Sequence, residues 1–149
     1  MKIVYALLLF GLLAGEDTNT ATVRKFWDAF SRQAWTELDA LVTSDYVHHA
    51  NGGSAPLARF KAGSAQVHKG LSDYKITIDD IVAVGDRVSI RWTGRGMHTG
   101  SMFGEPPTGK QVTVFGMHIH RLVDGKIAED WEVIDTGAIQ RQVAPAPPR

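Results

Sequence analysis

Cysteine is absent from the 149 residues of this chain. A disulfide, a thiolate nucleophile and a thiolate metal site are therefore excluded. An excess of either charge is also absent, because sixteen basic and sixteen acidic side chains give a formal net charge of zero and neither sign forms a long block. The chain thus lacks the basic surface that nucleic-acid binding requires, and we expect a neutral or weakly charged small-molecule ligand.

Long hydrophobic runs are nearly absent. The exception extends from Ile3 to Ala14, which suits the core of a signal peptide and falls short of the ~20 residues that span a bilayer. We therefore expect no membrane span. Only Lys2 precedes the run and no Ala-x-Ala cleavage site follows it. Residues 1–16 are accordingly either the signal peptide of an exported protein or an apolar extension of a cytoplasmic one.

The rest of the chain is long and apolar enough for one domain with a core of its own. We place this domain at residues 17–143. The last six residues, 144–149, form a proline-rich tail, because Pro145, Pro147 and Pro148 cannot continue a helix.

Helical patterns dominate the first half of the domain. Apolar residues at positions 23, 26, 27 and 30 predict an amphipathic helix that begins near Asp17, with Thr18 or Thr20 as its cap. A short helix is expected through Leu38, Leu41 and Val42, and a brief strand over 44–49. A weaker helical pattern covers 57–71 and is interrupted at position 63 by glycine.

The second half alternates apolar and polar residues, as strands do. Strands are expected over 74–79, 87–92, 111–122 and 127–135, with turns at Gly85-Asp86 and Asp124-Gly125 and a long loop over 94–109. This order predicts an α+β domain: a cone-shaped barrel in which about three N-terminal helices pack on a strongly curved, mixed, mostly antiparallel sheet. The open end of such a cone holds a small ligand in a mostly apolar cavity.

Several local motifs coincide with those of one family. They are His98-Thr-Gly100, Gly104-x-Pro106-Pro107-Thr108-Gly109, the hairpin from Leu122 to Ile127, Trp131, Asp135 and Arg141-Gln142. From about Thr22 to Val143 the chain resembles the SnoaL-like polyketide cyclases, or ester cyclases, of the nuclear-transport-factor-like superfamily. The resemblance implies an intramolecular aldol condensation on a small hydrophobic or aromatic carbonyl substrate. A carboxylate removes a proton beside two carbonyls, and neither a metal nor a cofactor takes part.

The resemblance also implies site residues. The family's catalytic aspartate falls at Glu132, the neighbouring histidine at His118, and a polar pocket position at His48. Glutamate keeps the carboxylate but adds a methylene, and a displacement of about 1 Å can cost ~100-fold in rate.

Strict alternation from the two-residue turn sets Glu132 opposite Met117, away from the face of His118. A β-bulge would bring the two residues together, and a carboxylate in an apolar cavity could then exchange a proton near neutrality. Without a bulge Glu132 faces outward. Asp135 is a second candidate acid or base, or else the cap of a helix that begins at Thr136.

The other histidines divide by position. His118 is either a proton carrier or a hydrogen-bonded core residue, and His120, near the turn, is expected to be exposed. His98 either binds substrate or holds the loop that follows it. His48 and His49 are adjacent on a strand, so only one of them can enter the cavity.

We expect no metal, because nothing fixes a third ligand beside His118-x-His120. Met102, Phe103 and Trp131 are candidate substrate contacts, and Pro106-Pro107 belongs either to a lid or to a simple turn.

The favoured function is a cofactor-independent acid–base enzyme. The alternatives are a non-catalytic module that binds a small hydrophobic molecule, a ketosteroid-isomerase-like enzyme, and an epoxide-hydrolase-like enzyme. The isomerase needs an inward tyrosine, and Tyr46 and Tyr74 are not clearly placed for it; the hydrolase needs an inward arginine, for which the sequence offers no candidate. We also expect a homodimer, because the outer face of such a sheet is often covered by a second subunit.

Overall fold

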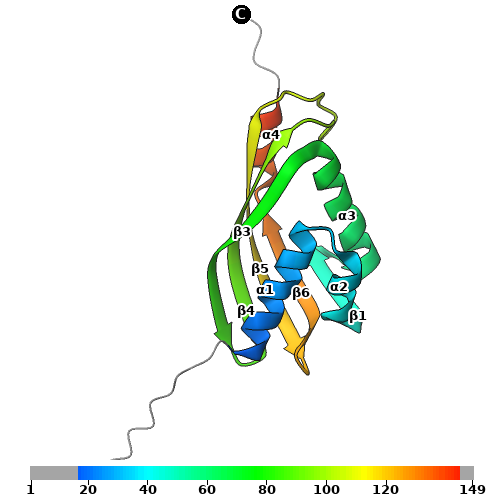
Figure 1. Ribbon diagram of the computed structural model, residues 1–149, viewed down its shortest axis with the longest axis vertical. Helices are drawn as coiled ribbons and strands as arrows, with labels where there is room; N and C mark the ends of the chain where they lie inside the picture. Colours follow the sequence, from blue (N-terminus) through cyan, green and yellow to red (C-terminus); the bar gives the residue numbers. More distant parts are fainter. Residues whose placement is uncertain (1–16, 145–149) are drawn as a thin grey trace, which may run out of the picture.

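The computed structural model describes residues 17–144, so the expectations for residues 1–16 and for the tail beyond Ala144 lie outside the described part. Four helices pack on one six-stranded sheet (Figure 1). In chain order the elements are α1 (Thr18–Ser31), α2 (Trp35–Ala40), β1 (Val42–Ala50), β2 (Gly53–Pro56), α3 (Leu57–Gly70), β3 (Leu71–Val84), β4 (Arg87–His98), β5 (Gln111–Val123), β6 (Lys126–Ile134) and α4 (Thr136–Val143). Within residues 17–144, no helix is long and apolar enough to cross a membrane.

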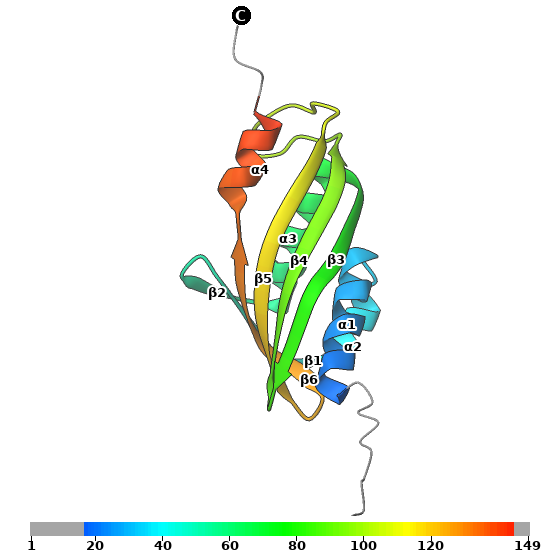
Figure 2. The same ribbon diagram turned by 90° about the vertical axis from the view of Figure 1, so that its left-hand side faces the viewer.

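The strand order is β2-β1-β6-β5-β4-β3. The β1–β6 pair is parallel and the other four pairs of neighbouring strands in the described sheet are antiparallel, which confirms the predicted α+β class and the mixed sheet. The sheet is curled but does not close into a barrel, since β2 and β3 remain its two edges. The helices α1, α2 and α3 lie on one side of it, and α4 lies near one end (Figures 1 and 2).

The first helix buries its predicted apolar face. Val23, Phe26 and Trp27 are at most 3% exposed and pack against the sheet. The cap, however, is Asp17 rather than a threonine: its carboxylate accepts from the backbone N–H groups of Asn19 and Thr20.

Several boundaries differ from the predicted ones, and the strand predicted over 74–79 extends from Leu71 to Val84. The second helix ends at Ala40, and Val42 already belongs to β1. The strand β4 continues through Gly94 to His98, where a loop was expected. Gly94 fits because the Tyr74 ring lies directly over it, in space that a Cβ would occupy. The helix α3 also continues through Gly63.

A β-bulge shifts the register of the β5–β6 hairpin. Arg121 pairs with Glu129, yet the next residue, Leu122, pairs with Ile127, which leaves one extra residue on β6. Beyond this point His118 pairs with Glu132. The bulge therefore moves alternate side chains of β6 onto the inner face of the sheet.

Candidate active site

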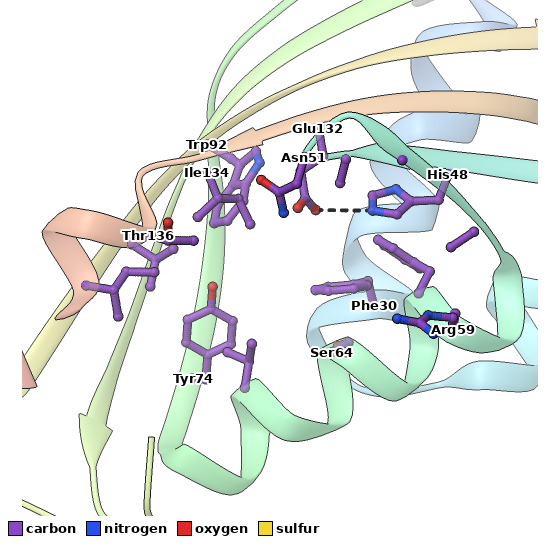
Figure 3. A pocket seen from close by; sticks show the side chains of 18 of the residues that line it. Phe30, His48, Asn51, Arg59, Ser64, Tyr74, Trp92, Glu132, Ile134 and Thr136 are labelled. Carbon is purple, nitrogen blue, oxygen red and sulfur yellow. Dashed lines mark ion pairs between the residues drawn. The ribbon is translucent and has the colours of Figure 1, made fainter. Parts of the chain in front are cut away.

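A cavity of about 730 Å³ lies between α3 and the inner face of the sheet (Figure 3). Its aromatic lining comes from Trp27, Phe30, Phe60, Tyr74, Trp92 and Phe103. Its polar lining includes His48, Asn51, Arg59, Ser64, Glu132 and Thr136. This combination of an apolar wall and a few polar groups is typical of small-molecule sites.

Glu132 and His118 meet at the cavity wall. The Oε2 atom of Glu132 lies 3.2 Å from Nε2 of His118. The side chain of Glu132 is 18% exposed and lines the cavity, whereas His118 is fully buried behind it. The bulge that brings the two residues together is present, and of the two alternatives the outward-facing Glu132 is excluded.

Two tryptophans hold the histidines of β5. The indole Nε1–H of Trp92 donates to Nδ1 of His118 at 3.0 Å, and that of Trp27 donates to Nε2 of His120 at 3.0 Å. His120 is completely buried under α1, so the expectation that it is exposed is wrong. Burial and the neighbouring His118 lower the pKa of His120 to about 3, which keeps this side chain neutral at physiological pH.

Asp130 is a buried acid that the sequence interpretation missed. Its Oδ1 atom lies 2.6 Å from Nδ1 of His48, and its Oδ2 atom lies 3.9 Å from Nδ1 of His120. Burial by itself would raise the pKa of Asp130, but the hydrogen bond to His48 and the nearby histidines lower it below its ordinary value. Counting back two residues from Glu132 along an alternating strand was the signal that could have found it.

His48 is the histidine of β1 that reaches the cavity. Burial lowers its pKa, but the hydrogen bond and the negative charge of Asp130 outweigh burial and raise the pKa above its ordinary value. Its Nε2 atom lies 3.9 Å from Oε2 of Glu132, the contact dashed in Figure 3. The Glu132 carboxylate therefore lies beside two imidazoles. The hydroxyl of Tyr46 is buried near Asp130, and burial together with that carboxylate raises the pKa of the phenol.

Two candidate site residues, Asp135 and His98, lie outside the lining of the cavity. Asp135 is exposed and caps α4 by accepting from the N–H of Ala138 at 2.8 Å, so the capping alternative is the one observed. His98 is buried outside the cavity lining, with Nδ1 3.0 Å from the hydroxyl of Thr108, and so holds the loop.

Trp131, a candidate substrate contact, lies outside the lining of this cavity. It lies between two residues whose side chains reach the inner face, so its own side chain takes the opposite face. There its ring stacks on His49 at 5.1 Å, and the guanidinium of Arg87 lies over it. Met102 and Phe103, by contrast, do line the cavity.

Two cavity residues bear on the hydrolase-like and isomerase-like alternatives, which need an arginine and a tyrosine in the cavity. Arg59 on α3 lines the cavity, although the sequence offered no inward arginine, and Tyr74 on β3 lines it as well. Helix and strand patterns could not place them, because each faces the cavity from an element whose boundary or curvature the sequence left open. Across residues 17–144, no three histidine, aspartate or glutamate side chains are arranged to hold a metal ion.

The protein is an α+β domain with a curled sheet and an apolar cavity under α3, and a carboxylate lies beside two imidazoles at the cavity wall. These features define a small-molecule cavity protein with groups suited to proton transfer. More specifically, the chain belongs to the SnoaL-like polyketide cyclase family, whose model matches residues 21–143.

Solved structures agree with this assignment. AclR from Streptomyces galilaeus, a proposed hydroxylase, is 26% identical over 88% of this chain and 85% of its own, with a TM-score of 0.79. IdmH from Streptomyces antibioticus, a proposed polyketide cyclase, is 25% identical over 85% of this chain and 98% of its own, also with a TM-score of 0.79. A SnoaL-like protein from Jannaschia sp. CCS1 shares the fold at 20% identity, 89% and 100% coverage and a TM-score of 0.78. No curated protein sequence matches this chain.

Proposed function

We propose that this protein is a cofactor-independent acid–base enzyme that closes a ring in a carbonyl substrate by intramolecular aldol condensation. The observation that supports it best is the placement of the Glu132 carboxylate at the cavity wall, 3.2 Å and 3.9 Å from Nε2 of His118 and His48. Glu132 is the general base, and His48, which also lines the cavity, polarises the reacting groups, whereas His118 lies behind Glu132.

The proposed reaction needs two proton transfers. Glu132 removes a proton from a carbon between two carbonyls, and the resulting enolate oxygen is stabilised by His48, whose protonated form is favoured by Asp130. The enolate carbon then attacks a second carbonyl of the same molecule, and a C–C bond forms. The new alkoxide takes back the proton that Glu132 had removed. Substrate and product are therefore isomers.

The cavity lining favours a small hydrophobic or aromatic substrate. Six aromatic side chains line the cavity, and Ser64 offers a buried hydroxyl without a hydrogen-bond partner in the described part of the protein. A substrate carbonyl or hydroxyl at that place would satisfy it.

The test is a screen of β-dicarbonyl polyketide esters with the wild-type protein and Glu132→Gln. We expect ring closure at unchanged mass in the wild type and a loss of about 100-fold or more in kcat for the variant. Glu129→Gln is the matched control, because Glu129 lies on the same strand but pairs with Arg121 outside the cavity. Equal rates for wild type and Glu132→Gln would remove Glu132 as the base.

The same screen separates the other candidate functions. Binding without turnover supports the ligand-binding module, and double-bond migration supports an isomerase, for which Tyr74 supplies a hydroxyl-bearing ring in the cavity lining. Hydrolysis of an epoxide probe supports the hydrolase. A product that gains one oxygen atom supports hydroxylation, the activity proposed for AclR.

We further propose that the protein is a homodimer through the outer face of β5 and β6. Phe115, Met117, Ile119 and Val133 form an exposed apolar patch there. A formal net charge of zero leaves little repulsion between two copies. Sedimentation equilibrium of the wild type and of Met117→Lys tests this, with a monomeric wild type as the contrary result.

A further inference from the structure

One nitrogen of the His118 ring accepts a hydrogen bond, and the other lies beside a carboxylate without a hydrogen bond of its own. The indole Nε1–H of Trp92 donates to Nδ1 at 3.0 Å, and Oε2 of Glu132 lies 3.2 Å from Nε2. An indole nitrogen can only donate a hydrogen bond, so Nδ1 must present its lone pair. The remaining proton of a neutral imidazole then belongs to Nε2, beside the carboxylate. Protonation of Nδ1 would break the bond to Trp92 and leave a buried indole N–H unsatisfied.

We propose that Trp92 is a positioning residue that keeps His118 neutral, with its proton on Nε2, next to Glu132. This proposal rests on the proposed role of Glu132 as the base. A neutral His118 lies beside the carboxylate without adding a second positive charge to the one that a protonated His48 brings. A buried imidazolium would instead favour the ionised carboxylate strongly, and a carboxylate that holds its charge so well is a weak base.

The position of Trp92 is itself fixed by its neighbours. On β5, Gly116 pairs directly with Trp92, and a Cβ at Gly116 would overlap the indole ring. From α1, Trp27 packs against it with ring centroids 5.5 Å apart. Trp92 is 3% exposed. Its N–H therefore has little freedom to turn away from His118.

In the two neighbouring histidines, the direction of the pKa shift follows the kind of hydrogen-bond partner. His120 accepts from Trp27 in the same way, and its pKa is lowered. His48 faces the Asp130 carboxylate through Nδ1, and its pKa is raised. An indole donor thus accompanies an imidazole whose neutral form is favoured, and a carboxylate partner accompanies one whose protonated form is favoured. Of these histidines, His48 is the one that lines the cavity.

The charged and titratable groups around His118 come from three strands. They are Glu132 and Asp130 on β6, His48 on β1 and His120 on β5. From α1 and β4 the ring is faced by Trp27 and Trp92. The charges of these four groups therefore also act on the protonation of His118.

The direct test is ¹⁵N NMR of the histidine rings as a function of pH, with the wild type and Trp92→Phe. In the wild type we expect an unprotonated Nδ1 and a protonated Nε2 at His118. In Trp92→Phe we expect a mixture of tautomers and proton uptake at higher pH. Trp27→Phe is the matched control, because it should change the signals of His120 and leave the tautomer of His118 unchanged.

A wild-type spectrum with the proton on Nδ1 would overturn the proposal by itself, even if Trp92→Phe does not fold. An identical His118 titration in the wild type and a folded Trp92→Phe would overturn it as well.

Activity gives a second readout that simple loss of packing does not produce. In Trp92→Phe the acidic limb of the kcat profile should move to higher pH, because His118 becomes charged there and weakens the base. The limb should stay in place if Trp92 only fills space. Full activity of Glu132→Gln would instead refute the proposed function, while the NMR result for Trp92 and His118 would still stand.

Discussion

His48 and Asp130 are direct neighbours across the parallel strands β1 and β6, and their Nδ1 and Oδ1 atoms lie 2.6 Å apart. Asp130 has no exposed surface, and His48 is 8% exposed. The pair therefore joins two strands that are far apart in sequence and also prepares the histidine that faces the cavity. Structure and proposed chemistry depend on the same contact.

Replacement of Asp130 by asparagine should cost about 3–5 kcal/mol in the free energy of unfolding, because it leaves a buried His48 without its charge partner. Chemical denaturation measures this loss. The matched control is Asp39→Asn, which removes the carboxylate of an exposed ion pair with Lys61 and should cost far less. A loss no larger than that of the control would contradict the buried pair.

The same substitution should lower kcat more than it raises KM. His48 without the carboxylate loses the interaction that favours its protonated form and fixes its orientation toward the enolate. Steady-state kinetics at a pH where the variant is folded provide the measurement. A change confined to KM would mean that the pair serves substrate binding alone.

Acid should destabilise the fold partly through His120. Its pKa is lowered to about 3 from 6.5, so the unfolded chain binds its proton first as the pH falls. The stability that the neutral His120 contributes is complete above pH 6.5 and is lost between pH 6.5 and about 3, at up to about 1.4 kcal/mol per pH unit. Unfolding curves over this range should be less steep in pH for His120→Gln, and parallel curves would argue against the prediction.

Alkali should weaken the His48–Asp130 pair. The pKa of His48 is raised, so its contribution is complete below its ordinary value of 6.5 and is lost as the pH rises through the raised value. Asp130 has a lowered pKa, so its contribution is complete above 3.8 and is lost as the pH falls through the lowered value. The pair therefore stabilises the fold most between these limits. A double-mutant cycle between His48→Asn and Asp130→Asn should show its largest coupling there and less coupling at alkaline pH.

Asp135 should behave as a cap and not as a catalyst. Asp135→Ala removes the acceptor for the N–H of Ala138 and should cost about 1 kcal/mol of stability. Because the side chain is exposed and does not line the cavity, kcat should stay at the wild-type value. Thermal unfolding and initial rates measure the two effects, and a large fall in kcat would return Asp135 to the catalytic candidates.

Local pattern was enough to predict the order of most elements, although the short strand β2 was missed. The helical spacing around Phe26, the alternation along β5 and the Asp124-Gly125 turn each depend on residues close together in the chain. The family motifs lie in the same segments. For this reason the α+β class, the helices on one side of the sheet and the resemblance to SnoaL-like cyclases were available without coordinates.

The sequence alone determined which chemical groups the protein possesses: no thiol, a neutral overall charge, and histidines and carboxylates on two consecutive strands. Only the tertiary structure decided which of them meet. One extra residue in the β5–β6 ladder turns Glu132 toward His118, and a parallel pairing of distant strands brings His48 to Asp130. Alternation tells only that neighbours face opposite ways, whereas the face each one takes depends on register and on what packs above it.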